Sequence, residues 1–594
     1  MPDERPPDQT ITDHPAGDRL ETWGEIAAYL GREIRTVQRW EKTMALPVRR
    51  LVGAPDRVPR VFALKSEVDA WRREHEVLKK ALDSSEEVPA PESGPTTSTE
   101  TEEKSSSLLR RRPVQAFLVV VVTALLTIGT PKLVEMLWPS KVILGVRPFG
   151  NLGEQTEAFI PAGLTEEMVA RLGQLHPDRL LVVPLTGAPP AARASSPNLR
   201  VDYILQGTVR RINDQVAITA QLIQTSNQTV VWGNSYERDV KDLLRVQTDV
   251  ADAIVTEVFN KLPHPAPTAR EVNRDAYLAY LEGRYFWNRR TADSIQKAVA
   301  LFQKSIAADA TYAPAYAGLA DCYELLGSAP YTAMPPKAAF PLAEAAARKA
   351  LELDERLAEA HVSLGYAYLA YEWNFSAADR EFKRALELRP GYATAHQYYG
   401  YYLTAAGQLP QAIEQRKRAV DLDPLSPLMA SALGEAYYQS RQFDQTIAQN
   451  QRALSLDPAY AIALVNIGRA YQQKGMHAEA QAAFQKILAA VPDDPAVLAL
   501  LGHEYAVSGR RDEALQSIAK LNSLAAHRYV PAIYYSLVYT GLGDLNEAFR
   551  WMDKAVDERT EYLIYLGSDP LADPLRRDPR FAVLMKRVGL PFTY

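Results

Sequence analysis

"SALGEAYYQSRQFDQTIAQNQRALSLDPAYAIALVNIGRAYQQKG", residues 431–475, contains the spacing that decides the fold of the C-terminal half of the chain. Gly434 and Gly468 lie 34 residues apart within it. The spacing continues in both directions, with one interval of 35 residues, through Gly365, Gly400, Gly434, Gly468 and Gly502. Prolines recur every 34 residues at Pro390, Pro424, Pro458 and Pro492. Such a period predicts a stack of similar units that bury one continuous core.

Each unit is predicted to be a helical hairpin. The glycine lets the two helices approach closely, and the proline ends the second helix. The seam is expected to be filled by Tyr368, Tyr437, Tyr471 and Tyr505 from the first helices and by Ala385, Ala419 and Ala453 from the second. This pattern resembles the tetratricopeptide repeat, which implies an α-solenoid. Gly283 and Gly318 mark earlier copies and Ser536 a degenerate last one, giving about eight units over residues 275–560, with residues 561–594 as a C-terminal cap.

The concave groove of such an array is the predicted site for a protein or peptide partner. Positions on the first helix, counted from each glycine, are expected to point into the groove and to be exposed. They are Gln397, Tyr401, Ser431, Glu435, Tyr438, Gln439, Arg469, Gln472, Gln473 and His503. Their tyrosine, charged and amide groups suit an extended peptide or a helix. The alternative is an ordinary hydrated solenoid surface.

Residues 141–262 are predicted to form a small α/β domain. The segments "VILGV" and "LLVVP" read as buried strands, "GLTEEMVARLGQL" as a helix, and Asn213-Asp214 as a hairpin turn. A strand in "TVVWGNSY" and a closing amphipathic helix follow. The stretches "PFGNL", "AGLTEEMVARL" and "VDYILQGTVRR" resemble the TolB-like amino-terminal domain. The segment "TGAPPAARASSPN" departs from that family's pattern, where a longer helix is usual.

Two unlike segments precede this domain. Residues 81–112 are poor in large apolar side chains and rich in acidic ones, which predicts a disordered linker with a basic end. Residues 113–137 contain an uncharged, mostly apolar run from Val114 to Thr130, long enough for a single transmembrane helix. Arg110, Arg111 and Arg112 at its N-terminal end place the N-terminus in the cytoplasm. The alternative is a buried helix in a wholly cytoplasmic protein.

The N-terminal part, after a disordered stretch over residues 1–19, is predicted to be a small basic domain over residues 20–80. "TWGE" at Thr22 is a capping box that opens a helix. A second helix turns Val37 inward and leaves basic and amide side chains on one face, as a DNA major groove requires. Between Arg32 and Arg73 there are 11 Lys or Arg residues and 5 Asp or Glu residues, although the whole chain of 594 residues has a net charge of −5.

The stretches "EIAAYLG", "RTVQRW" and "RVFALKSEVDAW" resemble the winged helix-turn-helix of the MerR and excisionase type. The resemblance implies that the chain binds duplex DNA, and it allows a dimer on DNA. The resemblance implies that the recognition helix contains Arg35, Thr36, Gln38 and Arg39 and that the wing contains Arg49, Arg50, Arg57 and Arg60. Lys42 adds to the same set, because it shares the exposed helix face with Arg35, Gln38 and Arg39. The alternative is a basic helix that holds a protein partner.

The sequence holds no recognisable catalytic, cofactor or metal site. No phosphate loop, dinucleotide fingerprint, HExxH or CxxC motif occurs. His361 and His396 occupy equivalent repeat positions, where packing is favoured over metal binding, and Cys322 reads as a buried apolar residue. We therefore expect a protein that is not an enzyme.

These features predict a mainly α-helical, multidomain protein that acts as a membrane-anchored transcriptional regulator or sensor of a bacterial inner membrane. Its DNA-binding domain would lie in the cytoplasm, and its TolB-like and repeat regions would lie in the periplasm. The alternative is an envelope scaffold whose repeats assemble partners and whose N-terminal domain is only an anchor that does not bind DNA.

Overall fold

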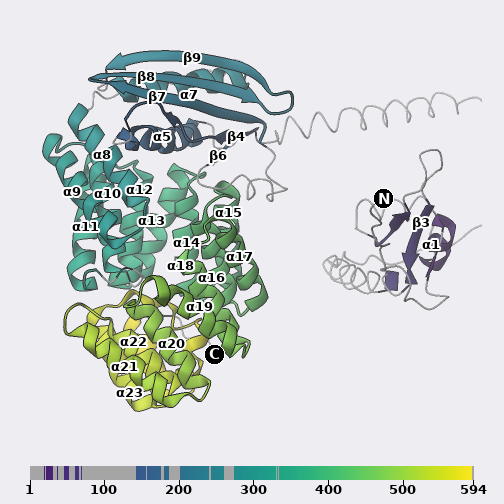
Figure 1. Ribbon diagram of the computed structural model, residues 1–594, viewed down its shortest axis with the longest axis vertical. Coiled ribbons are helices and arrows are strands. Elements are labelled where there is room, and N and C mark those ends of the chain that lie inside the picture. Colours follow the sequence, from purple (N-terminus) through teal and green to yellow (C-terminus); the bar gives the residue numbers. More distant parts are fainter. Residues whose placement is uncertain are drawn as a thin grey trace, which may run out of the picture. The chain divides into compact units, whose positions relative to one another are not determined.

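The computed structural model (Figure 1) describes the parts of the chain that carry its cores. The described residues are 19–20, 22–30, 37, 46–51, 60–65, 68–69, 142–154, 157–175, 179–185, 201–239, 242–259, 273–328, 331 and 333–590. The chain divides into two compact units, Met1–Ala116 and Phe117–Tyr594. The linker and span expected at residues 81–137 lie outside the described residues. Within the described ranges, no helix is both long enough and apolar enough to cross a membrane.

The first unit contains a helix and a three-stranded antiparallel sheet. The elements are β1 (Arg19–Leu20), α1 (Trp23–Leu30), β2 (Arg49–Leu51) and β3 (Arg60–Leu64), and the sheet order is β1-β3-β2. The backbone N–H of Glu25 donates to the Thr22 hydroxyl at 3.2 Å, so Thr22 caps α1 as expected. Ile26, Ala27, Leu30, Val37 and Val68 form the core, together with Leu20, Leu46 and Ala63.

The second unit begins with a mixed sheet covered on one face by two helices. Its strands are β4 (Val142–Val146), β5 (Gly150–Asn151), β6 (Leu180–Pro184), β7 (Tyr203–Ile212), β8 (Gln215–Gln224) and β9 (Thr229–Asp239). The order is β6-β4-β7-β8-β9, with β5 beside β7. The β4 strand pairs parallel with β6 and β7, whereas β7, β8 and β9 form an antiparallel meander. The turn between β7 and β8 lies at Asn213, whose φ of 56° is left-handed, as the predicted hairpin requires.

Helices α5 (Phe159–Leu175) and α7 (Leu243–Phe259) pack against the apolar face of this sheet. Leu164, Met168 and Leu172 of α5 are buried, which confirms the predicted helical spacing. Val216, Ile218, Ala220 and Leu222 alternate inward from β8. All the strands and helices expected between residues 141 and 262 are therefore present.

An array of eight antiparallel helix pairs follows within the described residues (Figure 1). The first helices are α8 (Arg274–Trp287), α10 (Ala313–Gly327), α12 (Ala358–Ala367), α14 (Ala393–Ala405), α16 (Pro427–Gln439), α18 (Ala461–Gln473), α20 (Pro495–Val507) and α22 (Ala532–Gly541). The second helices are α9 (Ala292–Ala308), α11 (Pro336–Leu353), α13 (Phe375–Leu388), α15 (Leu409–Leu422), α17 (Phe443–Leu456), α19 (His477–Ala490), α21 (Arg511–Ala525) and α23 (Leu545–Glu558).

The irregular interval of 35 residues has a local structural cause. Between Gly365 and Gly400, the end of α12 continues as a π-helical turn, η3 (Tyr368–Glu372), which accommodates one additional residue. The chain after α23 contains η4 (Glu561–Tyr565), η5 (Pro570–Ala572), α24 (Asp573–Arg576) and α25 (Pro579–Val588).

The repeat glycines pack as predicted. A β-carbon on Gly468 would lie 2.6 Å from Cε1 of Phe484, so only glycine fits there without displacement of the ring. Ala385, Ala419 and Ala453 are buried, as expected. The expected exposure of Tyr438 is wrong, because this side chain is fully buried. Of the tyrosines predicted to fill the seam, Tyr368 is buried, and the other three, Tyr437, Tyr471 and Tyr505, are half-buried.

Candidate partner-binding groove

The seam between the two helices of each repeat changes character in the middle of the array. Phe302, Phe382 and Phe484, on α9, α13 and α19, pack against Gly283, Gly365 and Gly468 of their own repeats. At the equivalent positions of the two intervening repeats, spaced by 34 residues, stand Arg416 and Asn450. Both are completely buried. The central repeats therefore have a polar seam where their neighbours have an aromatic one.

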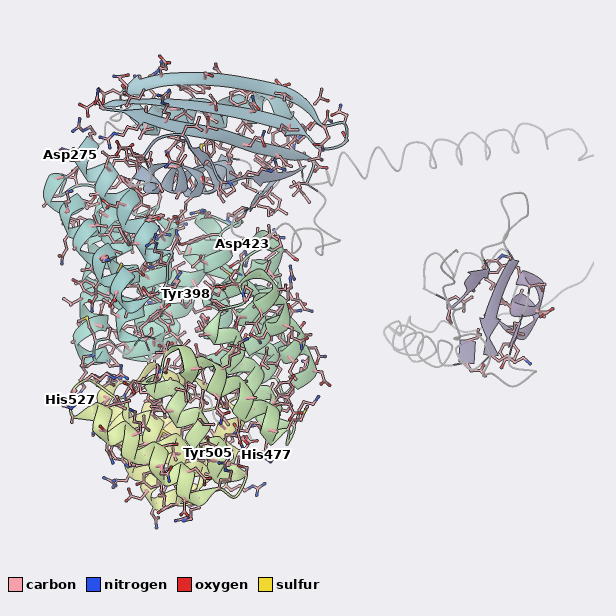
Figure 2. The ribbon with its side chains drawn as sticks, viewed as in Figure 1. Asp275, Tyr398, Asp423, His477, Tyr505 and His527 are labelled. Atoms are coloured by element: carbon pink, nitrogen blue, oxygen red, sulfur yellow. The ribbon has the colours of Figure 1, made fainter. Side chains whose placement is uncertain are left out.

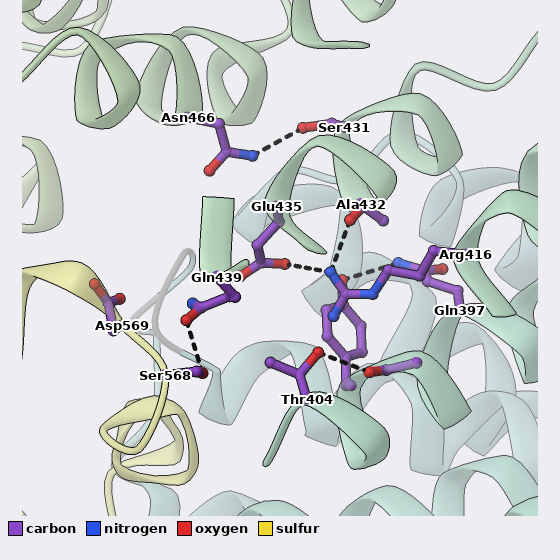
Figure 3. Close-up of polar contacts among 12 residues, drawn as sticks. Gln397, Thr404, Arg416, Ser431, Ala432, Glu435, Gln439, Asn466, Ser568 and Asp569 are labelled. Atoms are coloured by element: carbon purple, nitrogen blue, oxygen red, sulfur yellow. Dashed lines mark hydrogen bonds and ion pairs between the residues drawn. The ribbon is translucent and has the colours of Figure 1, made fainter. Parts of the chain in front are cut away.

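The polar seam is held by hydrogen bonds between repeats (Figure 3). Arg416 Nη1 donates to the Ala432 carbonyl at 2.7 Å and lies 3.4 Å from Glu435 Oε2. The Ser431 hydroxyl accepts from Asn466 Nδ2 of the next repeat at 3.2 Å (Figure 3). It also donates to Asn450 Oδ1 of its own repeat at 2.7 Å. Because a buried polar group without a partner is costly, these bonds make the central repeats depend on one another.

The expectation that the predicted partner-binding residues are exposed is wrong. Seven of them are buried: Gln397, Ser431, Tyr438, Gln439, Arg469, Gln472 and His503. Tyr401, Glu435 and Gln473 are half-buried. Part of the reason is the stacking of adjacent first helices, which buries Ser431 against Asn450 and Asn466. The other part is a segment of the chain itself.

Residues 559–576, here called the C-terminal segment, lie against the first helices of the array. The Ser568 hydroxyl donates to Gln439 Oε1 at 2.8 Å (Figure 3). The Tyr565 ring meets the Tyr401 ring in an edge contact, with their centroids 6.3 Å apart. The Tyr366 hydroxyl bonds to Glu561. This part of the expected cap therefore occupies positions that the sequence assigned to a partner, so the cap extends from the end of the array onto its first helices.

A buried ion pair is the deepest of these contacts. Arg469 on α18 pairs with Asp569, whose side chain is wholly buried. Asp569 also accepts from the Tyr562 hydroxyl and, at 2.9 Å, from the backbone N–H of Leu571. Burial lowers the pKa of Arg469, but Asp569, together with Tyr438, Tyr562 and Glu435, outweighs burial, so the pKa is raised overall. Arg469 is therefore always charged, and Asp569 is its counterion.

Tyrosine rings continue from the C-terminal segment into the array. Tyr398, in the middle of the array in Figure 2, contacts Tyr366 and Tyr401 with centroid distances of 4.9 Å and 5.7 Å. Arg416 lies over the Tyr401 ring, 4.3 Å from its centroid. Burial raises the pKa of Tyr401 to about 12, so its hydroxyl stays protonated and can donate a hydrogen bond. The groove floor thus combines aromatic faces with buried cations.

Three non-glycine residues stand at turns where four other repeats use glycine. Gly407, Gly475, Gly509 and Gly543 connect the two helices of their repeats with φ between 70° and 82°. At the equivalent turns, Trp373 and Arg441 have φ of 59° and 60°, a conformation that costs side-chain-bearing residues about 1–2 kcal/mol. Arg441 forms two bonds to Asp573, of 2.8 Å and 2.7 Å, and Arg559 lies 4.0 Å from the centre of a Trp373 ring. Both side chains therefore contact the C-terminal segment. Arg290, with φ of 54°, stands at the corresponding turn of the first pair and contacts Trp287 instead.

A second charged cluster joins the sheet to the array. Arg284 on α8 pairs with Glu166 on α5 and, at 3.1 Å, with Asp321 on α10. Glu167, which follows Glu166 on α5, accepts a hydrogen bond from the Tyr280 hydroxyl at 3.2 Å. Burial and the charges of Glu166 and Glu359 raise the pKa of Glu167 to about 7. The two adjacent carboxyl groups therefore have pKa values shifted in opposite directions, because Arg284 lies beside Glu166 and lowers its pKa.

The two repeat histidines are held within their own repeats. His361 Nδ1 lies 2.7 Å from Glu381 and its Nε2 lies 3.0 Å from the Glu355 carbonyl. His396 makes the equivalent contacts with Gln415 and Pro390. No metal-ligand cluster occurs within the described residues. Cys322 is buried and unpaired.

The predicted DNA-binding residues are only partly placed. Arg49, Arg50 and Arg60 lie on β2 and β3, which pair antiparallel with Arg50 opposite Val61. The remaining six, Arg35, Thr36, Gln38, Arg39, Lys42 and Arg57, lie outside the described residues. The strand pair occupies the segments predicted for the wing.

Sequence reasoning missed Arg416, Asn450 and Asp569. The first two could have been found by extending the 34-residue comparison to the second helix, where Arg416 and Asn450 stand between Phe382 and Phe484. Asp569 lies in a segment without periodicity, so no comparable signal marks it.

Comparison with known proteins adds a family for part of the chain. The tetratricopeptide repeat model matches residues 437–503. A putative adenylate cyclase 3 of Rhizobium meliloti is 28% identical over 192 residues, which are 30% of this chain and 32% of that protein. The transcriptional regulator HilA of Salmonella typhimurium is 24% identical over 299 residues, 48% of this chain and 52% of that protein. The chain thus spans about a third to a half of the length of these curated relatives.

Among solved structures, TTC0263, a tetratricopeptide repeat protein of Thermus thermophilus, is 20% identical with a TM-score of 0.29, over 33% of this chain and 98% of that one. The 34-residue period, the packed glycines and the match to the family model all indicate the same repeat. The C-terminal region of this chain is built of tetratricopeptide repeats.

Proposed function

We propose that this protein is a non-enzymatic, membrane-anchored transcriptional regulator whose N-terminal unit binds duplex DNA and whose repeats bind a protein partner. The observation that carries the proposal is the pairing of a separate N-terminal unit, which has its own core and arginine-bearing strands, with a repeat array built for protein contacts. The similarity to a regulator of transcription over 48% of the chain supports it.

The N-terminal unit is suited to bind DNA because basic residues are concentrated in it. An excess of basic residues between Arg32 and Arg73 stands against a net charge of −5 for the whole chain. Arginines on a strand pair can neutralise phosphates, while a preceding basic helix reads base edges. The resemblance to MerR-type domains assigns Arg39 to that helix. A dimer would present two such units to a palindromic site.

The proposed topology follows from residues 110–137. The three arginines at Arg110–Arg112 precede the apolar run and favour an N-terminus in the cytoplasm, with the sheet and the repeats in the periplasm of a bacterial inner membrane. The regulator would then couple a periplasmic binding event to DNA on the other side. The runner-up is an envelope scaffold, for which the repeats suffice and DNA binding is unnecessary.

A DNA-binding measurement separates the two. The full chain in detergent should bind duplex DNA with an affinity that falls steeply as salt rises. Arg39→Ala should cost about 1–3 kcal/mol and relax base preference, whereas Arg5→Ala, which removes the same charge outside the predicted domain, should change little. Equal binding of specific and random duplexes by wild type and Arg39→Ala would leave the scaffold as the better description.

A further inference from the structure

We infer that the repeat groove recognises an acidic, tyrosine-bearing segment of a partner protein and that the C-terminal segment is the built-in competitor for that partner. The inference rests on the proposed protein-binding role of the repeats, and it adds the chemistry of the partner and the means of regulation.

The first argument is the way the C-terminal segment is held. It contributes one main side-chain contact to each of four successive first helices: Glu561 to Tyr366 of α12, Tyr565 to Tyr401 of α14, Ser568 to Gln439 of α16 and Asp569 to Arg469 of α18. A repeat array binds an extended peptide in this manner, with each repeat supplying a contact. The segment itself consists of two 3₁₀ turns and a four-residue helix rather than another helical hairpin.

The second argument is the backbone conformation at Trp373 and Arg441. Glycine would relieve the left-handed conformation at both turns, as it does at Gly407 and Gly475. Instead, each turn carries a side chain that contacts the C-terminal segment, through Arg559 or Asp573. Strained residues of this kind persist where a contact depends on them.

The third argument concerns the groove's polar groups. Arg416 Nε and Nη2, Arg469 Nε and Gln439 Nε2 are buried donors without an acceptor within the described residues. The C-terminal segment thus leaves donors unused beside the groups that it does satisfy. A partner that supplies additional carboxylates or carbonyl oxygens would bond to them, which is the property that a competing ligand needs.

The chemistry of the partner follows from these contacts. The segment presents Tyr562, Tyr565 and Asp569, in the pattern tyrosine, two residues, tyrosine, three residues, aspartate. The tyrosines fit the aromatic groove floor, and the aspartate meets a permanently charged guanidinium. The fitting partner is therefore a peptide segment with two aromatic side chains followed by an acidic one.

The test measures whether a peptide and the C-terminal segment compete. The probe is a fluorescent synthetic peptide with the sequence of residues 559–576, "RTEYLIYLGSDPLADPLR", added to the full chain in detergent. Asp569→Asn should release the tethered segment, seen as faster hydrogen exchange over residues 561–573. The groove should then bind the peptide at least about 30-fold more tightly than wild type does. Adding Arg469→Gln to Asp569→Asn should abolish this gain.

Controls separate competition from unfolding. Asp553→Asn removes an exposed carboxylate that pairs with Arg587 and should behave as wild type. If Asp569→Asn loses helicity, Ser568→Ala with Asp573→Ala, which removes only peripheral contacts, should still increase peptide binding. The inference fails if released variants do not bind the peptide, if wild type binds it equally well, or if the segment stays protected in both variants. DNA binding by the same preparations is scored separately, so its loss would count against the proposed function and not against this competition.

Discussion

The junction between the sheet and the array offers a test in which two adjacent carboxylates respond oppositely to pH. The pKa of Glu167 is raised from its ordinary value of 4.5 to about 7, chiefly by burial and then by the negative charges of Glu166 and Glu359. A carboxyl whose pKa is higher in the folded state stabilises that state below pH 4.5, and this contribution is lost as the pH rises through 7. At about 1.4 kcal/mol for each pKa unit, the loss is on the order of 3 kcal/mol.

Glu167→Gln should therefore raise the melting temperature at pH 8 and leave it almost unchanged at pH 5. The neighbouring Glu166→Gln should instead lower the melting temperature at both pH 8 and pH 5. Arg284 holds the pKa of Glu166 below its ordinary value despite burial, so the stability that this ionised carboxylate contributes is present above pH 4.5 and is lost only as the pH falls further. Arg284 would still pair with Asp321 in this variant, and the Glu166 side chain is a third exposed. The loss in the free energy of unfolding should therefore be only about 1–2 kcal/mol.

The assay is calorimetry of the full chain with each variant at pH 5 and pH 8. The matched pair is informative because both changes replace a glutamate by its amide on the same turn of α5. A lower melting temperature for Glu167→Gln at pH 8, or equal shifts for the two variants, would show that the burial of Glu167 does not control its ionisation.

Three further predictions concern the array and the membrane. Phe484→Ala should destabilise its repeat by about 3–5 kcal/mol, because the ring fills the seam over Gly468. Asn450→Ala should destabilise its repeat by about 1–3 kcal/mol, because hydrogen bonds are lost. Calorimetry of the two variants compares these losses. Arg441→Gly should leave the melting temperature within a few degrees, since about 1 kcal/mol of relieved strain offsets an exposed ion pair, while hydrogen exchange near Asp573 becomes faster. A reporter active only in the periplasm should work when fused after residue 262 and fail near residue 100, and the opposite pattern would reverse the proposed topology.

The regular parts of the fold were predictable because their signals are local and repeated. The spacing of Gly434 and Gly468 fixes the helical hairpins, since a glycine there permits close packing against Phe484 in its own repeat. The alternation along β8 and the Asn213 turn likewise predict the hairpin from neighbouring residues. Such signals need only the sequence within one unit.

The residues predicted for the groove lie on the first helices, but most of them are buried and not exposed as expected. The offset from each glycine gives the direction of a side chain and carries no information about what packs on it. Arg469 is buried partly because Asp569, 100 residues later, pairs with it. The C-terminal segment has no helical period, so its place in the groove depends on long-range contacts that a periodic pattern does not encode.

Departures from the repeat pattern are the sequence signal that does point to this contact. A tetratricopeptide array needs an apolar residue in each seam and tolerates glycine at each turn, so a polar or bulky residue at those positions costs stability unless something compensates for it. Arg416 and Asn450 depart from the seam, and Arg290, Trp373 and Arg441 depart from the turn. Of these five, Trp373 and Arg441 contact the C-terminal segment directly, and Arg416 is linked to it through Tyr401. Asn450 and Arg290 instead contact residues of the array itself, Ser431 and Trp287. In this chain, three of the five positions that break the period are therefore linked to the C-terminal segment, which the regular positions alone did not predict.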